Sequence, residues 1–112
     1  MATRHCLALD LKDNPALIEK YKQYHQAGNV WPEIIDSIKA SGIEQAEIYL
    51  VGNRLFMILE VSDDFSFEAK QAADLSNSKV VEWETLMWTF QQQLPFATSE
   101  EKWLLMDKIF TL

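Results

Sequence analysis

Glycine, proline and cysteine are scarce in this chain: its 112 residues include three glycines, three prolines and one cysteine. Because it also has no repeated or low-complexity segment, its composition does not fit a disordered protein or a repeat array. The single cysteine, Cys6, cannot form an internal disulfide, and the first residues lack an apolar stretch of signal-peptide length. We therefore expect a reducing compartment, the cytoplasm. No segment is apolar over the length that a membrane span requires.

Basic residues are also in short supply, with 10 Lys and Arg against 17 Asp and Glu and a formal net charge of −7. Nucleic acids and anionic membrane surfaces attract clustered Lys and Arg. We therefore expect no nucleic-acid partner and no membrane partner, and a ligand that is small and neutral. Apolar residues make up 48% of the sequence, which at this length predicts a single domain over residues 1–112.

The first elements that the pattern predicts are a strand and an interrupted helix. Apolar side chains alternate over residues 4–11, as in a strand. Asn14 and Pro15 form a helix entry signal, because asparagine caps a helix and proline fits its first turn. The helical pattern is interrupted at residues 27–29 and then resumes until Gly42, a typical helix stop.

A hairpin, a second helix and a last strand follow. Residues 44–51 and 54–61 are rich in β-formers and are separated by a Gly-Asn pair suited to a tight turn. A mostly polar helical region leads to a helix over residues 80–94, where apolar side chains recur at helical spacing before a proline. The end of the chain, residues 105–112, is predicted to be a strand.

This order is β-α-β-β-α-β, which predicts an α+β fold of the ferredoxin-like type: a four-stranded antiparallel sheet with two helices on one face. Both faces of the predicted strand over residues 54–61 are partly apolar, since Leu55 and Met57 alternate with Phe56 and Ile58. One face is left without helices. We therefore expect a homodimer in which two sheets stack on each other.

The stretch from Tyr21 to Glu33 is the best candidate for chemistry, because it combines a histidine with several aromatic side chains. Tyr21 and His25 are four residues apart and so lie on one face of a helix. Histidine, with an unperturbed pKa of about 6.5, can donate and accept protons near neutral pH. A lone helical histidine is more often a surface or core residue, and Trp31 is explained equally well as an apolar plug before Pro32.

Several motifs carry a resemblance to a known family: Tyr21-x-x-x-His25, then HQAGNVWPEI, VGNRLFMILE and EWETLMW. Over nearly its whole length the chain resembles the L-rhamnose mutarotase family, and within it the L-fucose mutarotase branch. The resemblance implies a ferredoxin-like subunit that forms a dimeric α/β barrel. It also implies interconversion of the α and β anomers of a 6-deoxy-L-hexose, with no cofactor and no metal.

Carried over by position, the family's proton-donating histidine is His25 and its substrate-contacting tyrosine is Tyr21. Trp83 matches the second of two adjacent tryptophans that rhamnose-type members place on the sugar, whereas Glu82 stands in place of the first. Ala46 replaces a sugar-contacting tyrosine of those members. These departures favour L-fucose over L-rhamnose. The residues expected to bind the substrate are Tyr21, Trp31, Tyr49, Glu82 and Trp83.

Mutarotation requires protonation of the ring oxygen and deprotonation of the anomeric hydroxyl. Besides His25, the sequence leaves Tyr21, Glu33, Glu60, Glu82 or a water molecule as the second proton carrier. Three other functions remain open: an L-rhamnose mutarotase, a cofactor-independent oxygenase built on the same dimeric barrel, and a non-enzymatic dimeric ligand-binding module.

Overall fold

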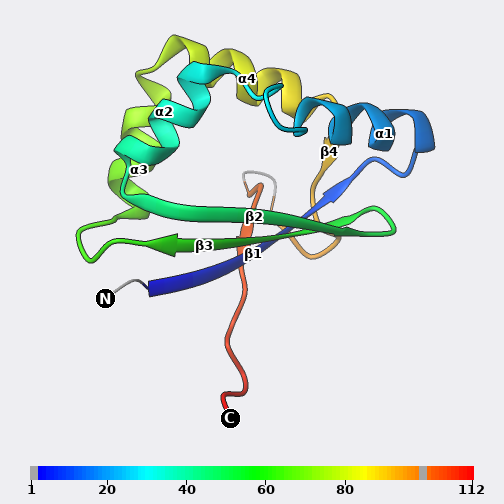
Figure 1. Cartoon of the computed structure of the whole chain (residues 1–112). Coiled ribbons are helices and arrows are strands. Elements are labelled where there is room, and N and C mark those ends of the chain that lie inside the picture. The colour runs from blue at the N-terminus through cyan, green and yellow to red at the C-terminus, as the bar shows by residue number, and fades with distance from the viewer. Residues whose placement is uncertain (1–2, 99–100) are drawn as a thin grey trace.

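The structure, a computed structural model, describes residues 3–98 and 101–112. Its sheet has the strand order β2-β3-β1-β4, with every neighbouring pair antiparallel and with β5 also paired to β1. Figure 1 shows the helices on one side of this sheet. The predicted α+β, ferredoxin-like arrangement is confirmed. The elements are β1 (Thr3–Leu11), α1 (Pro15–Tyr24), α2 (Pro32–Ala40), β2 (Ile43–Val51), β3 (Arg54–Val61), α3 (Phe67–Leu75), α4 (Ser78–Trp88), β4 (Gln91–Gln92) and β5 (Leu104–Leu105).

The hydrophobic core lies between the sheet and the helices. Leu11 of β1 and Leu55 of β3 are buried in one cluster with side chains from α1, α2 and α4, so alternate residues of these strands face the helices. Ala8 and Phe56 are paired with each other in the register and point to the opposite face. The core side chains from the helical layer are Tyr21, Ile34, Val80, Trp83 and Met87.

Local signals placed the ends of the first elements correctly. The Asn14 side chain accepts hydrogen bonds from the backbone N–H groups of Ala16 and Leu17 at 3.0 and 3.1 Å, which caps α1. Gly42, just after α2, has a φ of +96°, and a Cβ there would lie 2.7 Å from the Ser62 hydroxyl oxygen. The predicted break between two helical segments is confirmed, since α1 ends at Tyr24 and α2 begins at Pro32. The glycine stop is confirmed as well, because only glycine fits this backbone without strain.

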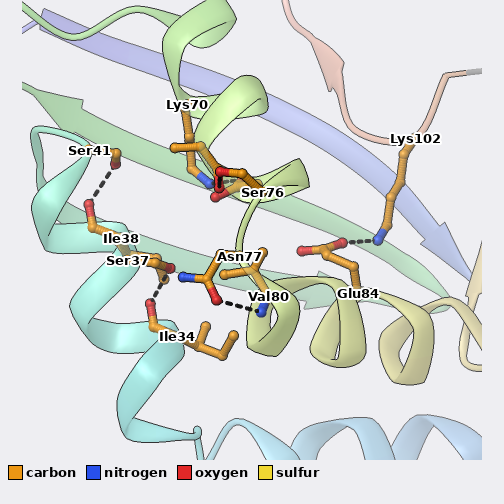
Figure 2. A network of polar contacts seen from close by, with 12 residues as sticks. Ile34, Ser37, Ile38, Ser41, Lys70, Ser76, Asn77, Val80, Glu84 and Lys102 are labelled. Atoms are coloured by element: carbon orange, nitrogen blue, oxygen red, sulfur yellow. Dashed lines mark hydrogen bonds and ion pairs between the residues drawn. The ribbon is translucent and has the colours of Figure 1, made fainter.

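Side-chain caps and ion pairs hold the C-terminal helical region, and Figure 2 shows the Asn77 cap and the ion pair between Lys102 and Glu84. The Asn77 side chain accepts from the backbone N–H groups of Lys79 and Val80 at the start of α4. Lys102, in the segment after β4, forms an ion pair with Glu84 in the middle of α4. This pair ties the C-terminal part of the chain to the helical layer.

The prediction of a helix over residues 80–94 was wrong at both ends. Helix α4 begins at Ser78 and stops at Trp88, and Gln91–Gln92 forms strand β4. The register pairs Gln91 with Leu11, and the N–H of Lys12 donates to the carbonyl of Phe90 at 2.8 Å. Pairing with the distant strand β1 therefore overrides the local helical pattern. It provides hydrogen-bond partners for backbone groups of this segment outside any helix.

The prediction of a last strand over residues 105–112 was also wrong. Only Leu104–Leu105 pair with β1, followed by a hydrogen bond from Met106 N–H to the Cys6 carbonyl at 2.7 Å. Residues 106–112 form no strand in the described chain. Figure 1 shows this segment leaving the sheet on the side away from the helices. Within the described ranges, no helix has the length and apolar character that a membrane crossing requires.

Candidate active site

His25 stands at the point where α1 ends. In a continued helix its backbone N–H would bond to the carbonyl of Tyr21, but here it bonds to Lys22 at 3.1 Å instead. The Tyr21 carbonyl is satisfied by the His25 ring, whose Nδ1 lies 2.8 Å away. A carbonyl oxygen can only accept, so Nδ1 carries the hydrogen. In the neutral ring, the lone pair on Nε2 then remains available to take a proton.

Aromatic rings surround this imidazole. The His25 ring centroid lies 4.3 Å from that of Tyr21 and 5.7 Å from that of Trp83. Trp83 in turn contacts the rings of Trp31 at 5.1 Å and Tyr24 at 6.2 Å. Burial among these rings lowers the pKa of His25 below its ordinary value of 6.5, and the hydrogen bond to the Tyr21 backbone opposes that shift in part. The neutral imidazole is therefore favoured.

Tyr21 is buried, and its hydroxyl accepts a hydrogen bond from Nε2 of Gln91 at 3.3 Å. Burial raises the pKa of Tyr21 to about 12, so the phenol stays protonated near neutral pH. Because Gln91 donates to the phenol oxygen, the hydroxyl hydrogen can point elsewhere and donate. Sequence reasoning missed Gln91, since the residue fell within the predicted helix over residues 80–94 and no motif marked it.

Trp31 reaches the cluster from the loop between α1 and α2. That loop turns back at Gly28, which has a φ of +85°, and the Asn29 side chain donates to the Gln23 carbonyl at 2.7 Å. The aromatic residue directly before Pro32 is thereby placed over α4. Of the residues expected from the sequence, the structure brings together Tyr21, His25, Trp31 and Trp83.

Two of the expected substrate residues are not brought to this cluster. Glu82 is exposed on α4 and forms an ion pair with Lys79 at 3.5 Å, because it precedes Trp83 by one residue and points about 100° around the helix from it. Tyr49 is exposed on β2 and donates to Glu47 at 3.1 Å. Since Tyr49 is paired with Phe56, its side chain lies on the sheet face opposite the helices.

Glu60 and Glu33, two further candidates for the second proton carrier, also lie outside the aromatic cluster around His25. Glu60 forms an ion pair with Arg4 at 3.0 Å, and the register places both on the face away from the helices. Glu33 is exposed in the first turn of α2, where a carboxylate suits the positive end of the helix dipole. Among the four side chains considered, Tyr21 is the one whose ring contacts His25.

A histidine with one ring nitrogen fixed by a hydrogen bond and packed among aromatic rings is suited to proton transfer on a small neutral ligand that presents apolar C–H faces. A family model described as L-rhamnose mutarotase matches residues 4–112. The chain belongs to the L-rhamnose mutarotase family and is therefore an isomerase, a sugar mutarotase.

The chain is similar to several known proteins over nearly its full length. It is 41% identical over 109 residues to an L-fucose mutarotase of Xanthomonas campestris pv. campestris, a match that covers 97% of this chain and 87% of that protein. It is 37% identical to a UPF0734 protein of Dictyostelium discoideum, covering 94% of this chain and 86% of that one. The crystal structure of an L-rhamnose mutarotase from Formosa agariphila has the same fold, with a TM-score of 0.71, 21% identity and 98% coverage of both chains.

Proposed function

We propose that this chain interconverts the α and β anomers of L-fucose, with His25 as the group that moves the protons. The observation that carries the proposal is the fixed imidazole: Nδ1 bonds to the Tyr21 carbonyl at 2.8 Å, which leaves Nε2 as the reactive atom. The likeness to an L-fucose mutarotase at 41% identity supports the choice of sugar. L-rhamnose is the second candidate, favoured by the description of the family model.

The proposed reaction opens and closes the sugar ring. Nε2 of neutral His25 takes the proton of the anomeric hydroxyl, and a proton is delivered to the ring oxygen as its bond to C1 breaks. Both oxygens are bonded to C1, so one imidazole nitrogen can reach both, and the imidazolium formed in the first transfer supplies the second proton. Rotation about the bond between C1 and C2, followed by the reverse steps, gives the other anomer.

Tyr21, Trp31 and Trp83 are assigned to binding. The high pKa of Tyr21 suits a neutral hydrogen-bond donor to the sugar rather than an acid that releases its proton. The indole rings offer flat apolar surfaces to the C–H faces and the methyl group of a 6-deoxy sugar. Burial of that methyl contributes only about 1 kcal/mol, so hydroxyl contacts must provide most of the discrimination.

Saturation transfer between the two anomeric proton signals in NMR tests the proposed activity directly. We expect the purified protein to accelerate exchange of L-fucose more than that of L-rhamnose, relative to each sugar in buffer alone. A larger acceleration of L-rhamnose would assign the chain to that sugar. If neither exchange were accelerated, the proposed function would be rejected.

The pH dependence of exchange follows from the state of His25. As a base, the ring works when neutral, and burial lowers its pKa below 6.5. Catalysed exchange should therefore persist as the pH falls past 6.5 and should be lost only as the pH falls through the lowered pKa. The measurement is kcat/KM for L-fucose from about pH 4.5 to 8, with the buffer rate subtracted at each pH. An acid limb centred at or above pH 6.5 would contradict the assignment.

We also infer that two copies stack through the sheet faces that carry no helix, as two halves of a dimeric α/β barrel. That face presents Phe56 and Ile58 beside Ala8. The C-terminal segment that leaves the sheet on the same side is apolar and exposed, with Ile109 at 94% and Phe110 at 75% exposure. Apolar surface of this kind is stabilised by burial against a second copy.

The dimer can be tested by a charge placed in the middle of that face. Ile58→Glu is expected to give particles of one chain mass, 13.0 kDa, whereas the unchanged protein gives twice that mass. Light scattering after gel filtration makes the measurement. Val81→Glu, on the exposed side of α4, is the matched control and should remain dimeric. A single-chain mass for the unchanged protein at all concentrations would contradict the inference.

A further inference from the structure

Gln91 is a buried polar residue with one half of its amide unused. Its side chain is only 4% exposed, and Nε2 donates to the Tyr21 hydroxyl at 3.3 Å. Its carbonyl oxygen Oε1 is buried and has no hydrogen-bond partner in the part of the chain that the structure describes. Because β4 pairs Gln91 with Leu11, the side chain points into the space between sheet and helices.

A buried amide oxygen without a partner destabilises a protein, whereas an apolar side chain of the same shape would not. Turning the amide over would not remove the problem. The Tyr21 hydroxyl contacts one of the two polar atoms, and the other would still lack a partner within the described residues. The amide is therefore best explained by a polar group that arrives with a ligand.

Gln91 lies close to the proposed catalytic histidine, where the sugar would bind. Its amide contacts Tyr21, whose ring lies 4.3 Å from the His25 ring, so Gln91 is one side chain away from the imidazole. A hexose is rich in hydroxyl groups, each of which can donate a hydrogen bond. A site that pairs a buried polar atom with a substrate hydroxyl strongly rejects sugars that lack a hydroxyl in that position.

We propose that Gln91 is a specificity-determining residue of the sugar site, in which Nε2 orients the Tyr21 hydroxyl and Oε1 accepts a hydrogen bond from a ring hydroxyl of the bound sugar. This rests on the proposed mutarotase function. L-fucose and L-rhamnose differ in the configuration of the hydroxyls at C2 and C4. An acceptor fixed on one side of the ring therefore favours one of the two sugars.

The test compares Gln91→Met with Gln92→Met. Methionine keeps the length of glutamine without the amide, and Gln92 is the exposed neighbour on the opposite face of β4. For Gln91→Met we expect KM for the preferred sugar to rise at least about tenfold and the preference between the two sugars to fall by a similar factor. The melting temperature should change little, since loss of the unpaired oxygen stabilises the fold while the buried Tyr21 hydroxyl loses its donor. Gln92→Met should change none of these.

Other outcomes separate this inference from the function on which it rests. A residue that only supports the fold would lower the melting temperature and reduce kcat/KM for both sugars equally, which would overturn the assignment. If Gln91→Met left KM and the preference between the two sugars unchanged in an active enzyme, the assignment would be overturned too. If the unchanged protein accelerated neither sugar, the mutarotase function itself would fail.

A binding measurement gives a readout that does not depend on turnover. In a ¹⁵N-labelled His25→Gln variant, saturation with L-fucose should shift the side-chain amide signals of Gln91 and leave those of Gln92 in place. Signals of Gln91 that do not move at saturation would overturn the proposed contact.

Discussion

Replacing His25 with glutamine should slow the catalysed exchange of L-fucose anomers by about 10²- to 10⁴-fold, the usual contribution of a positioned acid–base group. Glutamine can still donate a hydrogen bond toward the Tyr21 carbonyl, which His25 holds at 2.8 Å, so the end of α1 should keep its structure. Exchange would be measured by saturation-transfer NMR, and folding by circular dichroism.

His5→Gln is the matched control, because it removes the other histidine of the chain. His5 lies against the rings of Phe65 and Phe67, at 6.4 and 5.0 Å, and belongs to a different cluster from His25. Exchange by His5→Gln should stay within about threefold of that of the unchanged protein. A His25→Gln variant that remained as active as this control would contradict the mechanism. Retained sugar binding with full loss of exchange would distinguish an enzyme from a mere binding module.

Truncation of Trp83 should have the largest effect on stability. Trp83 is 5% exposed and packs against the rings of Trp31, Tyr24 and His25. Trp83→Ala should lower the free energy of unfolding by about 3–5 kcal/mol, through lost burial and the cavity that remains. Urea unfolding followed by circular dichroism measures the change, provided that the denaturant slope m is unaltered.

Trp88→Ala provides the comparison on the same helix. This side chain is 42% exposed and lies under the Lys102 ammonium at 5.4 Å, so its truncation should cost about 1 kcal/mol or less. Equal losses for the two variants would show that Trp83 is not a core anchor. Trp83→Phe then separates the two roles of the residue, since it should retain most of the stability and weaken sugar binding.

The parts of the fold that could be predicted depend on local chemistry. Asn14 caps α1 through its own side chain, and Gly42 and Gly52 adopt positive φ values at the end of α2 and in the hairpin turn. Each of these signals acts within a few residues, so it can be seen in the sequence. The contact between Tyr21 and His25 was predictable for the same reason, because helical spacing fixes it.

The parts that could not be predicted depend on contacts between distant segments. Gln91 belongs to a strand only because β1 offers an edge there, and that edge is 80 residues away in the sequence. Tyr49 and Glu82 show a related difficulty. A shift of one residue moves a strand side chain to the other face of the sheet, and moves a helical one about 100° around the axis. Matching a family motif by position does not fix this direction.

The end of α1 helps to determine which nitrogen of His25 is left for the proposed proton transfer. Because the helix stops there, the backbone N–H of His25 bonds to the Lys22 carbonyl, and the ring is the donor that the Tyr21 carbonyl receives in its place. One more helical turn would make the ring share that carbonyl with a backbone N–H, which would weaken the hold on Nδ1. Helix length, usually considered a matter of stability, therefore selects a tautomer in this protein.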